Sequence, residues 1–148
     1  AGELITFVTK TDEPDPLKRE GLPLYGRQIL MREQMVLDLA MQSVMAPFQC
    51  GTFQLGDLNL PAPPPKLALL KKTAVLCMLL CRHILRECSP NKRYAVRFVP
   101  QLQNSLGYGI RAASALRETF ADNAQMLDLV TDDIVGRCVT LIRAASGL

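Results

Sequence analysis

Residues 66–88 read KLALLKKTAVLCMLLCRHILREC and form the most apolar stretch of the 148-residue chain. Apolar residues recur there at helical spacing and cover nearly all sides of the predicted helix, a pattern typical of a helix buried inside a domain. The longest apolar run, residues 74–81, is far shorter than the roughly 20 residues that span a bilayer. We therefore expect residues 66–88 to be the central helix of a soluble domain.

The composition is that of a globular protein. Apolar residues make up 49% of the chain and charged residues 21%, which excludes a disordered or collagen-like chain. The length fits one domain, which can bury a core without a metal or disulfide staple. The net charge is only +3, Trp is absent and aromatic residues make up 5%, so we expect no nucleic-acid partner. Because the chain starts at Ala1 without the basic start of a signal peptide, we expect a leaderless piece of a longer protein.

The cysteines and the single histidine do not form a recognisable metal or catalytic motif. Five cysteines cannot all pair within one chain, and Cys77, Cys81 and Cys88 lie in the central apolar segment, so we expect buried, reduced thiols. On a helix His83 points away from Cys77, whereas zinc needs four converging ligands. No nucleophile motif accompanies His83. We therefore predict no metal, no cofactor and no enzymatic activity.

A second helix is predicted over residues 26–46, and Pro47 is expected to stop it. One side of this helix is apolar and consists of Ile29, Leu30, Val36, Leu37, Ala40, Met41 and Val44. The polar side lies opposite and carries Arg27, Gln28, Arg32, Asp38 and Gln42. Such a division is typical of a helix that covers a core with one face.

Two segments rich in proline interrupt the helical pattern. Residues 11–25 combine three prolines and a glycine with many charges and are predicted to be a linker. Residues 49–65 are predicted to be a Pro-rich loop, whose end at residues 60–65 forms a stiff extended spacer. An alternative reading of residues 60–65 is that they dock in an aromatic-lined groove of a partner.

The remaining segments also have helical period. Residues 4–8 are predicted to be the end of a helix or an isolated strand. Further helices are predicted over residues 90–105, with a kink or shortening at Pro100, and over residues 110–120, 123–130 and 132–145. The sequence therefore predicts an all-α single domain of stacked helix pairs, an α-solenoid, with a compact bundle as the competing layout.

One block of the second helix resembles a known family. The block Arg27-Gln28-Ile29-Leu30-Met31-Arg32-Glu33-Gln34, followed by Ala46-Pro47-Phe48, is similar to the armadillo-like RIH domain shared by inositol trisphosphate receptors and ryanodine receptors. Leu80-Cys81 with Ile84-Leu85-Arg86, the turn Leu106-Gly107-Tyr108, Asp122-Asn123 and residues 133–143 resemble later helices of that domain. The resemblance covers nearly all of residues 1–148, although residues 50–65 match poorly.

The resemblance implies a cytosolic piece of a homotetrameric, multi-pass calcium-release channel in an intracellular store membrane such as the endoplasmic reticulum. Its partners would be neighbouring domains and subunits, and the piece itself would make no membrane contact. In the trisphosphate receptors this helical domain forms one wall of the ligand cleft and a β-trefoil domain forms the other. The expected role is therefore a wall for inositol trisphosphate or a gating relay. The alternative is an interaction scaffold that binds no small ligand.

The resemblance also implies which side chains would contact phosphate. The family's three basic positions at spacing i, i+4 and i+7 fall on Tyr25, Ile29 and Arg32, of which Arg32 alone can neutralise phosphate. A second basic cluster opens the following helix. One register places it on Lys92-Arg93-Tyr94, and another places it on Cys88-Ser89-Pro90. The candidate residues for phosphate contact are Arg32, Lys92, Arg93 and Arg27.

Overall fold

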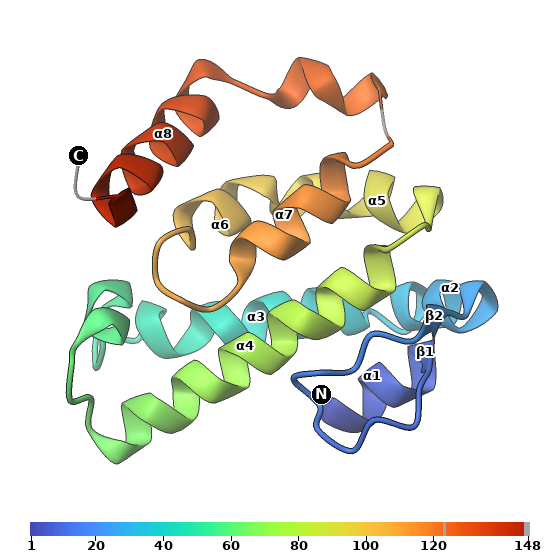
Figure 1. Ribbon diagram of the computed structural model, residues 1–148, viewed down its shortest axis with the longest axis horizontal. Helices are drawn as coiled ribbons and strands as arrows, with labels where there is room; N and C mark the ends of the chain where they lie inside the picture. Colours follow the sequence, from blue (N-terminus) through green and yellow to red (C-terminus); the bar gives the residue numbers. More distant parts are fainter. Residues whose placement is uncertain (123, 147–148) are drawn as a thin grey trace.

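The structure is a computed structural model that describes residues 1–122 and 124–146, and it confirms the all-α fold (Figure 1). The α-helices of this part are α1 (Gly2–Val8), α2 (Tyr25–Glu33), α3 (Val36–Gln49), α4 (Pro65–Leu85), α5 (Ser89–Ala95), α6 (Val99–Asn104), α7 (Ala112–Phe120) and α8 (Asp132–Ser146). Short 3₁₀ helices are η1 (Leu55–Asn59), η2 (Val96–Phe98) and η3 (Ala124–Leu129). Strands β1 (Thr9–Lys10) and β2 (Leu22–Pro23) pair antiparallel, with Thr9 opposite Pro23.

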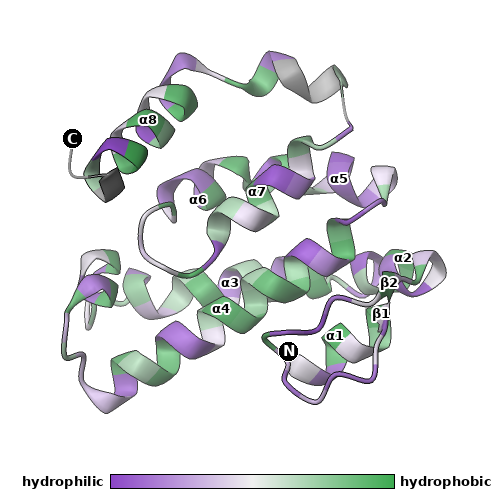
Figure 2. Cartoon of the chain, in the orientation of Figure 1, coloured by the Kyte–Doolittle hydropathy of each residue, from purple (hydrophilic) through white to green (hydrophobic). Residues whose placement is uncertain are grey.

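The long helix α4 is the centre of the fold, as its sequence predicts. It packs against α3 on one side and α7 on the other, while α1 and α2 contact it as well. Its second half is buried on every side, and Met78, Leu79, Leu80, Ile84 and Leu85 are each at most 2% exposed. Figure 2 shows apolar residues along most of α4 and mixed residues on the helices around it. Burial of this apolar surface is the main stabilising contribution to the domain.

The helices stack in successive layers on α4. Helices α2 and α3 lie on one side of α4, and α5, α6 and α7 lie on the other (Figure 1). Helix α8 follows beyond α6, where Gln103 Nε2 donates to Asp133 Oδ2 at 2.8 Å and Arg137 Nη2 donates to the Asn104 carbonyl at 3.1 Å. Ile134 is 7% exposed and fixes the start of α8 against the core.

The prediction of one helix over residues 26–46, stopped by Pro47, is wrong. The chain forms two helices there, because Met35 adopts a left-handed conformation with φ 56°. Its N–H closes α2 on the Arg32 carbonyl, and its own carbonyl accepts the first bond of α3 from Leu39. Pro47 lies inside α3, which ends two residues later at Gln49. A proline so near the end disturbs only the last turn, because few hydrogen bonds remain to be lost there.

The break after α2 changes the environment of Gln28, which the sequence places on the polar side. Gln28 is 1% exposed, and its Nε2 donates to the carbonyls of His83 and Arg86, both at 2.8 Å. Asn91, at the start of α5, is fully buried, and its Nδ2 donates to the Gln28 carbonyl at 2.9 Å and to the Ile84 carbonyl at 3.0 Å. These two amides join α2, α4 and α5.

The same two amides complete the hydrogen bonding at the C-terminus of α4. A helix leaves its last four carbonyls without partners inside the helix. In α4 the Arg82 carbonyl accepts from the Arg86 N–H at 2.9 Å, and the Leu85 carbonyl accepts from the Cys88 N–H at 3.1 Å. The carbonyls between them are those bound by Gln28 and Asn91. Every terminal carbonyl of this buried helix end is therefore satisfied.

Residues 11–25 are an ordered part of the domain. Arg19 is 9% exposed, and its guanidinium donates to the carbonyls of Gly2, Glu13 and Pro14. The segment also contains β2, and its last residue begins α2. At Gly21 an added Cβ would lie 2.2 Å from the Lys10 carbonyl oxygen, so only glycine lets the chain pass there. The predicted linker is therefore a loop that closes on α1.

Other predicted elements agree more closely with the structure. Residues 4–8 belong to a helix, α1. The helix predicted over residues 90–105 divides into α5, η2 and α6, and Pro100 is the second residue of α6, where a missing N–H costs little. The Pro-rich loop contains η1, and its last residue begins α4. Of the helix predicted over residues 123–130, residue 123 lies outside the described residues and the following six form η3.

We expect Asn91→Asp to lower the free energy of unfolding by more than about 3 kcal/mol and Asn91→Ala by about 1–3 kcal/mol. The aspartate keeps the shape of the side chain but sets a carboxylate against the Ile84 and Gln28 carbonyls, whereas alanine leaves them unpaired. Urea unfolding followed by circular dichroism measures both changes. The control is Asn59→Ala, which removes an exposed bond to the Gly107 carbonyl and should cost less than about 1 kcal/mol. Equal losses for all three variants would contradict the capping role of Asn91.

Candidate functional site

The candidate cation Arg32 lies in the last turn of α2, beside the start of α5. Its side chain is 24% exposed, and its Nη2 lies 3.8 Å from Glu33 Oε1. Burial raises the pKa of the Cys88 thiol, and the charges of Arg32 and Lys92 both oppose that rise. The two cations therefore act on the same thiol at the junction of α4 and α5. The arrangement brings the end of α2 and the start of α5 to one face of the domain, called below the α2–α5 face.

Lys92 is turned into the domain. It is 3% exposed, and its Nζ donates to the Ala121 carbonyl at 2.9 Å. Ala121 is the residue that ends α7, so the ammonium group lies at the negative end of that helix. The structure thus gives Lys92 an internal partner that its place in a basic pair does not indicate.

Arg93 and Arg27 lie on the surface but in different surroundings. Arg93 is exposed on α5, next to the inward-facing Lys92. Arg27 Nη1 donates to the Phe7 carbonyl at 3.0 Å, and its guanidinium lies 4.8 Å from the centroid of the Phe7 ring. Arg27 therefore attaches α2 to α1. Of the four predicted cations, Arg32 is partly exposed at the end of α2 and Arg93 is exposed on α5.

Both registers of the second cluster point to the same helix end. Cys88 immediately precedes α5 and is fully buried, Ser89 and Pro90 open the helix, and Lys92 and Arg93 follow in its last turn. The buried bond from Asn91 to the Gln28 carbonyl holds this end against α2. The packing therefore places either cluster beside α2, but the Cys88-Ser89-Pro90 register brings no cation there.

A tyrosine–aspartate contact extends the α2–α5 face towards α3. Tyr94 Oη donates to Asp38 Oδ2 at 2.8 Å, and the Arg97 guanidinium lies 3.7 Å from the centroid of the Tyr94 ring. The hydrogen bond to Asp38 raises the pKa of Tyr94. No sequence pattern pairs Tyr94 with Asp38. The only sequence signal is a polar residue at Asp38 between apolar neighbours of a core-facing helix.

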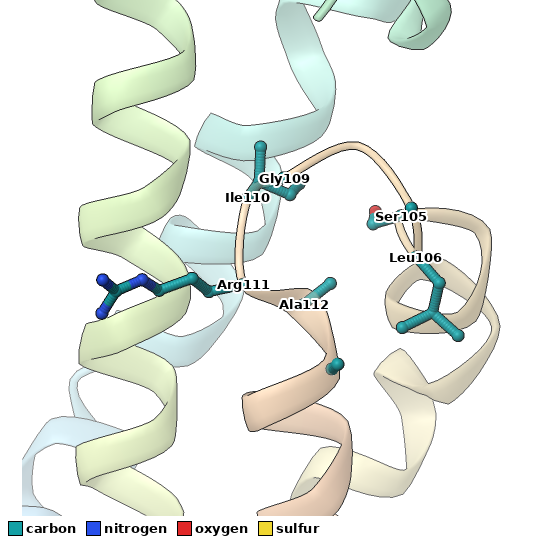
Figure 3. Close-up of a pocket in the computed structure, with 8 residues that line it drawn as sticks. Ser105, Leu106, Gly109, Ile110, Arg111 and Ala112 are labelled. Atoms are coloured by element: carbon teal, nitrogen blue, oxygen red, sulfur yellow. The ribbon is translucent and has the colours of Figure 1, made fainter. Parts of the chain in front are cut away.

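Three pockets of the described residues lie away from the candidate cations. A pocket of about 310 Å³ lies in the loop before α7, another of about 230 Å³ between α6 and the η3–α8 segment, and a third of about 200 Å³ between α1, α3 and α4. None of these three is lined by Arg27, Arg32, Lys92 or Arg93. In the first pocket the Arg111 side chain extends to the opposite side from Ser105 and Leu106 (Figure 3). The pocket is mainly apolar and does not suit a polyanion.

The family model of the RIH domain matches residues 2–147. This chain belongs to the RIH domain family. Over 152 aligned residues it is 28% identical to the inositol 1,4,5-trisphosphate receptor itr-1 of Caenorhabditis elegans, a match that covers 95% of the chain. The chain spans about 5% of the length of that receptor.

The RIH domain is not an enzyme. Within residues 1–122 and 124–146, no group of three or more His, Cys, Asp or Glu side chains could hold a metal ion.

Charged side chains of the RIH domain also form a network around the C-terminal half of α4. Arg82 Nη1 and Nη2 bind the Glu20 carboxylate in a two-point contact, with Nη2 2.9 Å from Oε2. Arg86 Nη1 lies 3.7 Å from Glu20 Oε2, and Arg82 Nε lies 4.0 Å from Glu118 Oε1 on α7. The network therefore connects the residue 11–25 loop, α4 and α7. Sequence reasoning missed it, because Arg82 and Arg86 also fit a snorkelling role on a buried helix.

The single histidine of this RIH domain is a core residue. His83 is fully buried in α4, and burial lowers its pKa, while the nearby Glu20 carboxylate acts in the opposite direction. The five cysteines are free thiols. Cys77, Cys81 and Cys88 are buried, which confirms that part of the prediction.

The Glu20–Arg82 contact predicts how stability depends on pH. The hydrogen bond from Arg82 holds the pKa of Glu20 below its ordinary value. Its stabilising contribution is therefore present above the ordinary carboxyl pKa and is lost as pH falls through the lower, folded-state pKa. Since the Glu20 side chain is 50% exposed, the effect is screened by solvent. We expect Glu20→Gln to lower Tm by about 1–3 °C at pH 7 and by less at pH 3.

Differential scanning calorimetry at both pH values and at high salt measures this effect. The matched control is Glu33→Gln, which removes the longer Arg32–Glu33 ion pair and should lower Tm less. A Tm difference for Glu20→Gln that stays the same at pH 3 and pH 7 would show that the contact does not act through charge.

Thiol reactivity provides a second prediction from burial. Burial raises the pKa of Cys81 to about 12, whereas Cys50 is exposed and Cys138 half-buried. In the folded protein, a thiol reagent such as 5,5′-dithiobis(2-nitrobenzoic acid) should modify Cys50 first and Cys138 more slowly. The three buried thiols should react only at the rate of unfolding, and Cys50→Ser should abolish the fast phase. A fast phase that survives in Cys50→Ser would contradict this order.

Proposed function

We propose that this RIH domain is a cytosolic helical module of an intracellular, ligand-gated calcium-release channel of the inositol trisphosphate receptor or ryanodine receptor type. The family match over residues 2–147 carries the proposal, and the similarity to a receptor named for inositol 1,4,5-trisphosphate supports it. The domain would lie on the cytosolic face of a calcium-store membrane and contact neighbouring domains and subunits of a homotetramer. None of the described helices is both long and apolar enough to cross a membrane.

Within such a channel, the geometry favours a gating relay. A trisphosphate ligand needs several cations converging in one cleft. The α2–α5 face offers Arg32 and Arg93, whereas Lys92 is bound to the end of α7 and Arg27 to α1. For Lys92 or Arg27 to contact a ligand, each would first have to give up that partner. We propose that Arg32 and Arg93 supply at most a minor part of any phosphate contact.

The hydrogen bonds that attach neighbouring helices to α4 and to one another support the relay. Gln28 and Asn91 attach α2 and α5 to the end of α4 through buried hydrogen bonds, and Tyr94 attaches α5 to α3 through Asp38. Helices joined in this way move as one body and repack at their outer interfaces. A displacement imposed at the α2–α5 face would therefore reach α4 and the layers beyond it without being absorbed inside the domain.

The alternative function is an interaction scaffold without a small ligand. A specific observation favours it as a second role: the Pro-rich residues 60–66 lie on the far side of the domain from α2 and are exposed except for the half-buried Pro63. This segment does not exclude a relay, because it leaves the α2–α5 face open.

The proposal is tested by calcium release from permeabilised cells that express the channel polypeptide carrying this domain. As a relay, the double variant Arg32→Gln/Arg93→Gln should shift the half-maximal inositol trisphosphate concentration by less than about threefold, since a shift of that size is under 1 kcal/mol. As a main ligand wall, loss of two charge-assisted contacts should shift it by at least about a hundredfold. Tyr94→Phe, which removes the bond to Asp38, should lower maximal release while ligand binding stays unchanged.

The control is Lys18→Gln, whose side chain is 74% exposed on the residue 11–25 loop. It should change neither the half-maximal concentration nor the maximal release. A hundredfold shift for the double variant would replace the relay with a ligand wall. Absence of any release evoked by inositol trisphosphate would point to the scaffold or to a ryanodine-receptor-like channel.

A further inference from the structure

The segment between η1 and α4 is presented to solvent between two buried anchors. Leu58 and Leu67 are each 1% exposed, and the residues between them are exposed except for the half-buried Pro63. Asn59 Nδ2 donates to the Gly107 carbonyl at 3.1 Å, and Lys71 Nζ donates to the Leu58 carbonyl at 2.7 Å. The stem of the segment is therefore fixed while its tip is free. In Figure 1 it forms the edge of the molecule at the end opposite α2.

The exposed residues 60–66 read LPAPPPK. Leu60 has φ −61° and ψ 136°, and Pro64 has φ −55° and ψ 149°, both in the polyproline II region. Proline also fixes φ near −65° at the other ring positions, so little conformational entropy remains to be lost on binding. The chain bends at Pro61–Ala62. A partner that binds a straight polyproline II segment would have to straighten the backbone at this bend.

The order of residues matches what a polyproline II groove requires. With three residues per turn, the pairs Leu60-Pro61 and Pro63-Pro64 lie on one side of such a helix, and Ala62 lies on the other. Paired apolar–proline units of this spacing fit the adjacent aromatic-lined slots of SH3-type domains. Lys66 follows the second pair by two residues, where a cation selects a groove that carries carboxylates at that end.

We propose that residues 60–66 are a docking segment for an SH3-type domain with an acidic end to its groove. The helix that follows does not need to unwind. Pro64 already has polyproline II angles, and its carbonyl accepts the first α4 bond from the Ala68 N–H at 3.0 Å. Pro65 has no N–H to lose, and Lys66 lies exposed in the first turn of α4. The inference is independent of the channel proposal, since it rests on this loop alone.

The test is a titration of the 148-residue chain, labelled with ¹⁵N, with an isolated SH3 domain that prefers a cation after the second proline. Amide signals of the non-proline residues in 58–68 should move, and those of the α2–α5 face should not. The double variant Pro61→Ala/Pro64→Ala should raise Kd at least about tenfold, which corresponds to about 1.4 kcal/mol. Lys66→Glu should raise Kd by a similar factor, because it reverses the charge that faces the acidic groove.

The matched control is Pro14→Ala, at an exposed proline in the residue 11–25 loop, which should leave Kd unchanged. Thermal unfolding of each variant verifies that the fold is intact, and the single variant Lys66→Glu serves if the double variant is unstable. Absence of binding at millimolar SH3 domain would overturn the proposal. So would binding that ignores the proline and lysine variants. A WW domain that binds more tightly than the SH3 domain would also overturn it, because the acidic groove would then have no role.

Discussion

The C-terminus of α4 is the constraint on which the rest of the domain depends. A helix end in the middle of a protein exposes carbonyls to an apolar interior, and each unpaired carbonyl destabilises the fold. Here the solution comes from other helices, because Gln28 of α2 and Asn91 of α5 bind the carbonyls that the chain's own turn leaves open. Meeting this local requirement fixes the positions of three helices at once. Buried bonds of this kind specify one arrangement, because few other packings would satisfy them.

The same hydrogen bonds between α2, α4 and α5 explain why the candidate basic residues divide into buried or paired ones and accessible ones. Once α5 is fixed beside α2, the helical spacing of its side chains directs Lys92 inwards to the end of α7. The next residue, Arg93, then faces outwards. Arg27 faces α1, and Arg32 remains at the border between the two helices. Basic residues that look alike in the sequence therefore have different roles. Some hold helices together, and others are available to a ligand or partner. This division supports the proposed relay over a ligand wall, because a face with few accessible cations binds a polyanion weakly.

The domain offers two surfaces at opposite ends of α4. One is the α2–α5 face, where the charged and polar contacts converge, and the other is the Pro-rich tip between Leu58 and Leu67. The rigid central helix separates them, and its core of fully buried aliphatic side chains makes the two ends parts of one body. A module built in this way suits assembly into a larger protein, since contacts at one end leave the other accessible.

The sequence by itself determined the elements that depend on local rules. The apolar period of residues 66–88 predicted the central helix, Pro100 predicted the division near α6, and the block at Arg27–Gln34 indicated the family. Tertiary structure decided the break at Met35, the helix that continues past Pro47, and the burial of Gln28. It also decided which candidate cation faces solvent, because that depends on the direction in which α5 leaves α4. A helical pattern gives the spacing of side chains along one helix, but the carbonyls, helix ends and charges of neighbouring helices determine which of those side chains are buried.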